Sequence, residues 1–256
     1  MSCEIIRNYY APMCGDWDKE EAKISSHAIL YRGCNFACSF CSYKYLTKVG
    51  YLNLSDDEFI LIIHELLRYG NRFKFSGGEP TIYNELPRHI RIVKEMGGFV
   101  FLDTNGSHPN VLGQLLDNHL IDVLGISLKG LSLEDAVKNS NARDAALCWE
   151  NVFRSIELAS LHPDVRVIIT YVFYNNAGLP ELERFSEIIS CYPNIYLKMN
   201  NLHYQVHNQP GLTPISGNVF IELAKRFVNF HPKWRGRVIV VDSQEAISDY
   251  DKIIFL

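Results

Sequence analysis

The sequence lacks an excess of charge of either sign. Lysine and arginine number 25, and aspartate and glutamate 29, which gives a formal net charge of −4 over 256 residues. Proteins that bind nucleic acid usually carry a basic excess, so this balance argues against a nucleic-acid partner.

Long apolar runs are also missing. The most apolar stretch, VRVIITYVF, is interrupted by Arg166 and Thr170, so it is no candidate for a membrane span. The first residues, MSCEIIRNYY, lack the basic start and apolar core of a signal peptide. We therefore expect a soluble, cytoplasmic protein without a membrane partner.

Cysteine is sparse except in one loop. The chain has seven cysteines, an odd number, which argues against the disulfide framework of a secreted protein. Cys148 and Cys191 lie inside helical patterns and are interpreted as small buried hydrophobic residues. The cysteines outside the loop are too scattered to predict a second metal cluster.

Segments rich in β-branched and aromatic residues alternate with segments of helical periodicity. This alternation predicts an α/β fold with a mostly parallel sheet and outer helices. About six strand–helix units favour a partial (β/α)6 barrel or a doubly wound sheet over a full eight-unit barrel. The predicted strands are 27–31, 72–75, 99–102, 123–128, 165–173, 195–199 and 238–242, and the helices 55–69, 86–96, 111–118, 141–160, 179–191 and 218–230.

No Pro/Gly/Ser-rich linker or internal repeat divides the chain. We therefore expect one domain over 1–256, with a core at about 27–242, a short N-terminal extension and a C-terminal tail. Polar or glycine-rich loops follow the predicted strands, with the sequences GCNFACSFC, SGGEP, DTNG, SLKG and NNLH. Because the carboxyl ends of parallel strands share one edge of a sheet, these loops predict a single convergent site.

The loop GCNFACSFC carries Cys34, Cys38 and Cys41 within eight positions. Structural zinc sites often combine two separated ligand pairs, and the chain has no second C-x2-C. Iron–sulfur clusters use cysteine thiolates, usually four. Three cysteines would leave one iron of a [4Fe–4S] cluster open to a small-molecule ligand, much as catalytic zinc keeps an open position.

The C-x3-C-x2-C pattern after a first strand, with Phe40 before the last cysteine, resembles the radical S-adenosylmethionine (SAM) superfamily. The resemblance implies that Cys34, Cys38 and Cys41 ligate a [4Fe–4S] cluster, whose open iron is chelated by the methionine part of SAM. It further implies that an electron from the cluster cleaves SAM to a 5′-deoxyadenosyl radical, which takes a hydrogen atom from the substrate. A reducing donor such as flavodoxin or ferredoxin would be a partner, and Phe40 would lie against the adenine.

SGGEP is similar to the glycine-rich loop of the same superfamily. The resemblance implies that Gly77, Gly78, Glu79 and Pro80 lie near the methionine amino group of SAM. Paired glycines allow backbone to approach a ligand closely. The alternative interpretation of these residues is an ordinary turn.

DTNG is more narrowly similar to the activating enzymes of glycyl-radical enzymes, of which the pyruvate formate-lyase activating enzymes are the nearest in layout. The resemblance implies that Asp103, Thr104 and Asn105 lie near the ribose or methionine of SAM. Asp and Asn at such positions also form helix caps or turns, which is the alternative.

Ser127 and Lys129 lie in SLKG, where those activases have Asp-Leu-Lys, and His203 lies where they have a histidine near SAM. The resemblance makes all three candidate SAM or substrate contacts, although an isolated lysine is usually a surface charge. Three departures matter: Ser127 removes an expected carboxylate, Thr170 stands where an arginine is expected, and KISSHAILYRG replaces a glycine-rich segment ending in an arginine before the cysteine loop.

These departures favour a small molecule over a protein as the substrate. We therefore predict a radical SAM enzyme that acts on a small-molecule substrate in a tailoring or biosynthetic pathway, with no side chain assigned as catalytic. One alternative is an activase that generates a glycyl radical on a partner enzyme. An alternative of another class is an iron–sulfur redox or metal-binding module without SAM chemistry.

Overall fold

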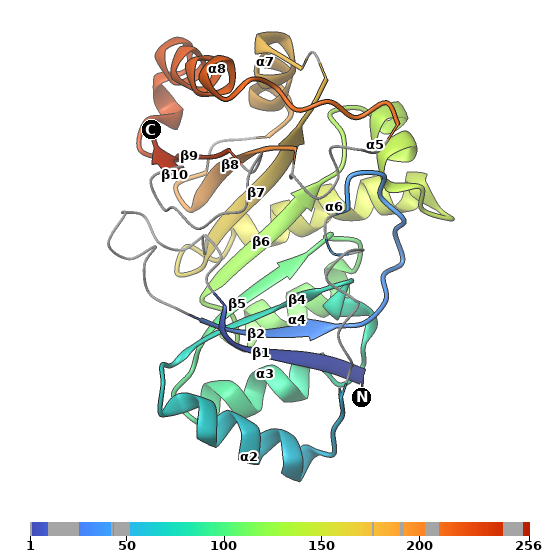
Figure 1. Cartoon of the computed structure of the whole chain (residues 1–256), viewed down its shortest axis with the longest axis vertical. Coiled ribbons are helices and arrows are strands. Elements are labelled where there is room, and N and C mark those ends of the chain that lie inside the picture. The colour runs from blue at the N-terminus through green and yellow to red at the C-terminus, as the bar shows by residue number, and fades with distance from the viewer. Residues whose placement is uncertain are drawn as a thin grey trace.

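The described part of the chain is built around one ten-stranded sheet. The computed structural model describes residues 2–9, 26–41, 43, 52–175, 177–189, 192–202, 210–242 and 253–256. The sheet order is β10-β9-β8-β7-β6-β5-β4-β2-β1-β3 (Figure 1). The strands are β1 (Ser2–Tyr9), β2 (Ser26–Tyr31), β3 (Leu52–Asn53), β4 (Arg72–Gly77), β5 (Phe99–Thr104), β6 (Val123–Leu128), β7 (Arg166–Phe173), β8 (Ile195–Asn201), β9 (Val238–Val241) and β10 (Ile253–Phe255).

Seven of these strands, β2 and β4 to β9, run parallel to one another, and β1, β3 and β10 pair antiparallel at the two sides. Helices follow six of the seven, and this confirms the predicted partial (β/α)6 layout. The α-helices are α2 (Asp56–Leu67), α3 (Leu86–Glu95), α4 (Pro109–Asp117), α5 (Leu133–Ser140), α6 (Ala145–Ser160), α7 (Leu179–Ile188) and α8 (Gly217–Phe230), with 3-10 turns η2 (Pro80–Ile82) and η4 (Pro232–Trp234).

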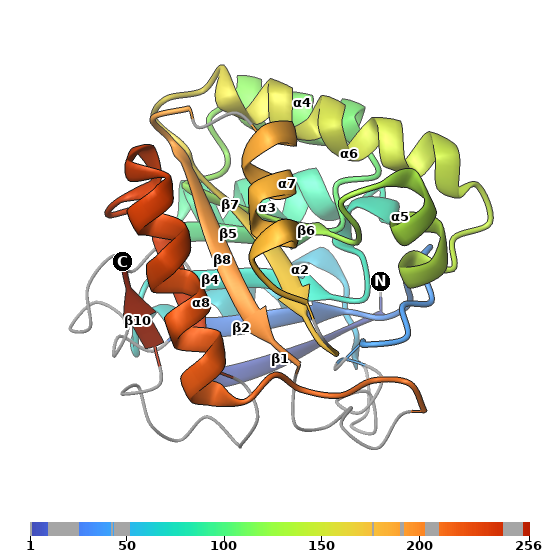
Figure 2. The ribbon, with the colours of Figure 1, turned by 90° about the horizontal axis from the view of Figure 1, so that it is seen from above.

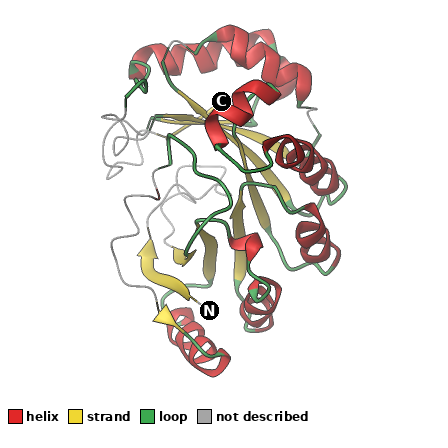
Figure 3. Ribbon diagram, turned by 90° about the vertical axis from the view of Figure 1, so that its right-hand side faces the viewer, coloured by secondary structure: helices red, strands yellow, loops and turns green. Residues whose placement is uncertain are grey.

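The helices lie along the outer side of the curved sheet (Figure 3), and α4 packs beside α6 (Figure 2). Alternate side chains of the parallel strands point outward and bury against these helices, as Phe75, Leu102 and Ile169 do, in one large core. Each such side chain contributes about 1.5–3 kcal/mol on burial. Among the described residues, no helix is long and apolar enough to cross a membrane.

The inner side of the sheet has a smaller apolar cluster. Phe101, Val123 and Ile168 pack there against one another, from three neighbouring strands. Because successive residues of a strand face opposite sides, the residues two positions later, at the carboxyl ends, face the same inner side. Two of these later positions carry polar side chains, Asp103 and Thr170, so the inner side of the sheet is apolar along the strands and polar toward their carboxyl ends.

The predicted helix over 141–160 is confirmed as α6, but it begins later than predicted, and the separate helix α5 before it was not predicted. α5 ends at Ser140, Asn141 takes the left-handed conformation at φ 46° and ψ 39°, and α6 begins at Ala145. Asn tolerates this conformation better than most residues, so it ends a helix rather than starting one. α5 had a local signal that was missed: Ser132 caps it by accepting from the Asp135 backbone N–H at 3.1 Å.

His89 is a buried titratable residue on the helical side of the sheet. Its ring lies 4.6 Å from that of Phe59, and the Tyr31 hydroxyl lies 2.9 Å from its Nδ1. Asp56 approaches Nε2 to 3.9 Å. Burial lowers the pKa of His89, and the nearby Asp56 and Glu85 carboxylates oppose that shift only in part, while Arg88 adds to it.

We expect the wild type to lose stability relative to His89→Gln as the pH falls from about 7 to about 5. An unfolded histidine titrates near pH 6.5, and the folded ring binds a proton less readily, so protonation below that pH favours unfolding. Urea unfolding at several pH values measures the difference in free energy of unfolding. Exposed His64→Gln is the control, and a His89→Gln difference that does not change with pH would contradict the prediction.

Candidate cofactor site

The cysteine loop begins directly after β2 and lies over the carboxyl ends of the strands. Its buried side chains Phe36, Cys38 and Phe40 pack with Leu202, which follows β8. The Phe40 ring lies 5.7 Å from that of Tyr174, which follows β7. Apolar contacts therefore hold the loop against the far half of the sheet.

None of the three loop cysteines forms a disulfide with another described residue. Cys34 is exposed as a residue, but desolvation of its sulfur raises the pKa of the thiol to about 11. The Phe36 N–H, which donates to Sγ at 3.3 Å, opposes this rise in pKa. Within the described residues, no three His, Cys, Asp or Glu side chains lie close enough together to hold a metal ion. The fit to an iron–sulfur cluster therefore rests on donor chemistry, because three thiols on one short loop are the ligands that iron–sulfur clusters use.

Two glycines of SGGEP let the loop after β4 touch the cysteine loop through backbone. The Gly78 N–H donates to the Tyr31 carbonyl and the Glu79 N–H to the Gly33 carbonyl, each at 2.8 Å. A Cβ on Gly78 would lie 1.6 Å from the Gly33 oxygen. A Cβ on Gly77, whose φ is 108°, would lie 2.4 Å from the Tyr31 oxygen. No larger residue fits this contact.

Glu79 joins the SGGEP loop to the DTNG loop. Its side chain is fully buried, and Oε1 accepts from the Thr81 N–H at 3.0 Å, the Thr81 hydroxyl at 2.5 Å and the Thr104 hydroxyl at 2.7 Å. Oε2 accepts from the Asn105 N–H at 2.6 Å. With its carboxylate engaged in this way and its N–H bonded to the Gly33 carbonyl, the predicted contact of Glu79 with SAM stays a prediction.

Asn105 joins the DTNG loop to the cysteine loop. Its Nδ2 donates to Asn35 Oδ1 at 2.8 Å and lies 3.8 Å from Cys34 Sγ. Asn35 in turn donates to the Ser107 hydroxyl at 2.9 Å. These hydrogen bonds therefore join three of the five loops that the sequence analysis placed at one edge.

Asp103 faces the inner side of the sheet, where its Oδ2 lies 2.6 Å from Lys74 Nζ and accepts from Ser76 at 3.3 Å. The Tyr43 hydroxyl lies 2.7 Å from the Ser76 hydroxyl. Lys74 is 5 % exposed, and sequence reasoning missed it. The alternation of RFKFSG was the available signal, because it places Lys74 opposite the outward-facing phenylalanines.

A second inner row runs across the next strands. Ser127 of β6 is in register with Thr170 of β7, which is in register with Lys198 of β8. Lys198 is 9 % exposed. Two residues on, Asn200 has a buried Oδ1 without a hydrogen-bond partner among the described residues. Lys198 and Asn200 were not singled out from the sequence.

Lys129 follows β6, and its Nζ lies 5.7 Å from the centre of the Phe40 ring. The structure thus brings Lys129 to the cysteine loop, as expected for a shared site. His203 lies outside the described residues.

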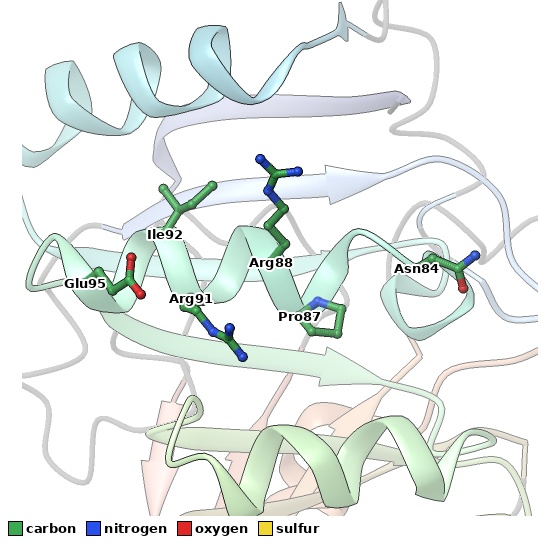
Figure 4. A pocket seen from close by; sticks show the side chains of 6 residues that line it. All are labelled: Asn84, Pro87, Arg88, Arg91, Ile92 and Glu95. Atoms are coloured by element: carbon green, nitrogen blue, oxygen red, sulfur yellow. The ribbon is translucent and has the colours of Figure 1, made fainter.

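A surface hollow of about 500 Å³ lies elsewhere, on the outer side of α3 (Figure 4). It is open to solvent and belongs to the helical layer, away from the strand ends that carry the loops. Its charged side chains are of both signs. The lining residues are Asn84, Pro87, Arg88, Arg91, Ile92 and Glu95.

The chain resembles known proteins over most of its length. Residues 28–185 match the model of the Radical SAM superfamily. An S-adenosylmethionine-dependent nucleotide dehydratase of Thermoplasmatales archaeon (strain ISO4-H5) is 23% identical over 232 residues, which are 88% of this chain and 78% of that protein.

Two further relatives match over shorter stretches. A Methanocaldococcus jannaschii protein named as a glycyl-radical enzyme activating enzyme is 34% identical over 108 residues, 42% of this chain and 44% of that protein. A Saccharolobus solfataricus protein named as a GTP 3′,8-cyclase is 33% identical over 161 residues, 62% of this chain and 50% of that protein. This chain thus spans half or less of these two relatives.

Solved structures show the same fold. Streptococcus suis SuiB bound to S-adenosylmethionine has a TM-score of 0.60 at 14% identity, over 84% of this chain and 46% of that one. The enzyme anSMEcpe, with bound AdoMet and the Cp18Cys peptide, has a TM-score of 0.60 at 18% identity, over 80% of this chain and 60% of that one.

We expect Gly78→Ala to disrupt the contact between the cysteine and SGGEP loops, because the new Cβ would overlap the Gly33 carbonyl. The free energy of unfolding should fall by about 1–3 kcal/mol or more, and iron bound after reconstitution should fall with it. The control is Gly113→Ala in α4, where the nearest atom lies at 4.0 Å. That change should stabilise the helix by up to about 1 kcal/mol. Equal stability and iron content in Gly78→Ala and wild type would contradict the prediction.

Proposed function

Because this chain belongs to the radical SAM superfamily, whose members carry a [4Fe–4S] cluster and SAM, we propose that Cys34, Cys38 and Cys41 ligate that cluster. The observation that carries the proposal is the joining of the cysteine, SGGEP and DTNG loops by backbone and side-chain hydrogen bonds. When bound, the cluster supplies the electron that cleaves SAM to a 5′-deoxyadenosyl radical. We further propose that the whole chain, with its core at 27–242, forms one such unit.

The protein's own groups would bind SAM across the joined loops. The Gly77–Pro80 backbone would meet the methionine amino group, since the paired glycines leave backbone accessible without side chains. Asp103 and Thr104 would lie near the ribose or methionine, and Phe40 with Lys129 near the adenine. Further contacts are proposed for Asn105, Ser127 and His203. The buried Phe36 and Phe40 would exclude water from the reacting atoms.

We propose that the substrate is a small molecule, and specifically a nucleotide. On the inner side of the sheet, buried Lys198 lies in one register row with the Thr170 and Ser127 hydroxyls, and Asn200 Oδ1 offers a free acceptor among the described residues. An ammonium group suits a phosphate, and an amide oxygen suits an N–H or O–H donor. Similar proteins are named as a nucleotide dehydratase and a GTP 3′,8-cyclase, which supports this class.

The second candidate function is activation of a glycyl-radical enzyme. It is favoured by the 34% identity with the Methanocaldococcus jannaschii protein. Against it stand Ser127 and Thr170, two neighbouring hydroxyls where the resemblance to activases led us to expect a carboxylate and a guanidinium. In either function, a reducing partner such as flavodoxin or ferredoxin would deliver the electron.

Single replacement of each loop cysteine tests the cluster. We expect anaerobically reconstituted wild type to bind about four irons per chain and to cleave SAM on reduction, and Cys38→Ala to do neither. Cys148→Ala is the matched control, because Cys148 is a thiol that packs near the loop but lies in α6. A full cluster and normal SAM cleavage in Cys38→Ala would refute the ligand assignment. A cluster that forms without SAM cleavage in wild type would favour a redox module.

Deuterium transfer tests the substrate. With nucleotides deuterated on the ribose or base, we expect label in 5′-deoxyadenosine, and we expect Lys198→Met to raise KM for the nucleotide at least tenfold by removing the buried cation. Lys225→Met, an exposed lysine of α8, should leave KM unchanged. No label from any nucleotide, together with a stable glycyl radical on a partner enzyme, would establish the activase instead.

A further inference from the structure

A hydrogen-bonded turn fixes the orientation of the Asn105 side chain. Asn105 is 5 % exposed, and its Oδ1 accepts from the Ser107 backbone N–H at 3.0 Å and from the Ser107 hydroxyl at 2.6 Å. With the oxygen committed to two donors, Nδ2 must point the other way. It faces the cysteine loop.

The backbone of the same residue is held from the opposite side. The Asn105 N–H donates to the buried Glu79 carboxylate at 2.6 Å, and the Gly106 N–H donates to the Thr104 hydroxyl at 3.1 Å. The Gly106 carbonyl accepts from Ser155 of α6 at 2.7 Å. Asn105 is therefore anchored through three elements and has little freedom to turn its amide.

The held amide meets the cysteine loop at two atoms. Nδ2 donates to Asn35 Oδ1 at 2.8 Å and lies 3.8 Å from Cys34 Sγ, within the longer range of a hydrogen bond to sulfur. A second N–H, from the Phe36 backbone, approaches the same sulfur at 3.3 Å. The Phe36 donor is a backbone N–H, so changing the Phe36 side chain leaves it in place. The Asn105 amide is therefore the donor that a side-chain substitution removes.

We propose that Asn105 is a positioning residue that raises the reduction potential of the iron–sulfur cluster through its hydrogen bond to Cys34. A reduced cluster carries one more negative charge than an oxidised one, and part of that charge resides on the thiolate sulfurs. An N–H donor stabilises the more negative state, and it does so strongly where water is excluded. The inference rests on the proposed ligation of the cluster by Cys34.

Redox titration of the reconstituted, SAM-free protein, followed by electron paramagnetic resonance, tests this role. We expect Asn105→Leu to bind as much iron as wild type but to titrate at a more negative potential. At a fixed applied potential, the ratio of reduced to oxidised cluster should fall about tenfold, the effect of losing one hydrogen bond to a charged group. A tenfold change is 59 mV for a one-electron couple.

Asn105→Asp is a second variant that tests the same role if the leucine variant misfolds. It keeps the acceptor for Ser107 and the size of the side chain, and it replaces the donor with an oxygen that repels a thiolate. Its potential should also shift to a more negative value. Asn194→Leu is the matched control, because Asn194, directly before β8, is a buried asparagine whose Nδ2 donates to three backbone carbonyls between the end of α6 and β7. It should lower stability and leave the potential unchanged.

Two outcomes would overturn the proposal, and they are distinguishable. Wild-type potentials in both Asn105 variants, with wild-type iron content, would refute the role of Asn105 while leaving the cluster ligands intact. A full cluster in Cys34→Ala would refute the ligation by Cys34, and with it both this role and the proposed function of that residue.

Discussion

The arrangement of the site depends on one buried carboxylate. The Glu79 side chain is buried, and its carboxylate accepts four hydrogen bonds from two neighbouring loops. None of these four donors is a cation. A buried charge is costly unless it is hydrogen-bonded in this way, so each donor must stay in place for the others to be favourable. These hydrogen bonds hold the loops after β4 and β5 together, and Asn105 connects both loops to the cysteine loop.

Much of the fold follows from local patterns. Apolar runs alternating with helical periodicity predicted the parallel strands and their helices, and the cysteine and double-glycine motifs fell at strand ends as expected. Lys74 and Lys198 were missed because alternation gives the face of a residue but not its neighbours, which depend on register between strands distant in sequence. The antiparallel strands β1, β3 and β10 were missed because they lie outside the strand–helix alternation.

The start of the predicted helix over 141–160 was misplaced for a different reason. Asn141 takes the left-handed conformation after α5, and α6 begins only at Ala145, which the helical periodicity did not indicate. Asn35 and Ser107 were also overlooked, since polar loop residues carry no periodicity to mark them. Their importance comes from the folded contact between the loops after β2 and β5, which no local pattern contains.

The backbone contact between Gly33 and Gly78 has a consequence for how this protein can diverge. A side chain at position 78 would meet a carbonyl oxygen, and no substitution at position 33 removes a carbonyl, so no compensating mutation exists there. The row of Ser127, Thr170 and Lys198 has no such restriction, because its side chains project from regular strands. Descendants of this sequence can therefore vary the side chains of this row while inheriting the double-glycine loop unchanged.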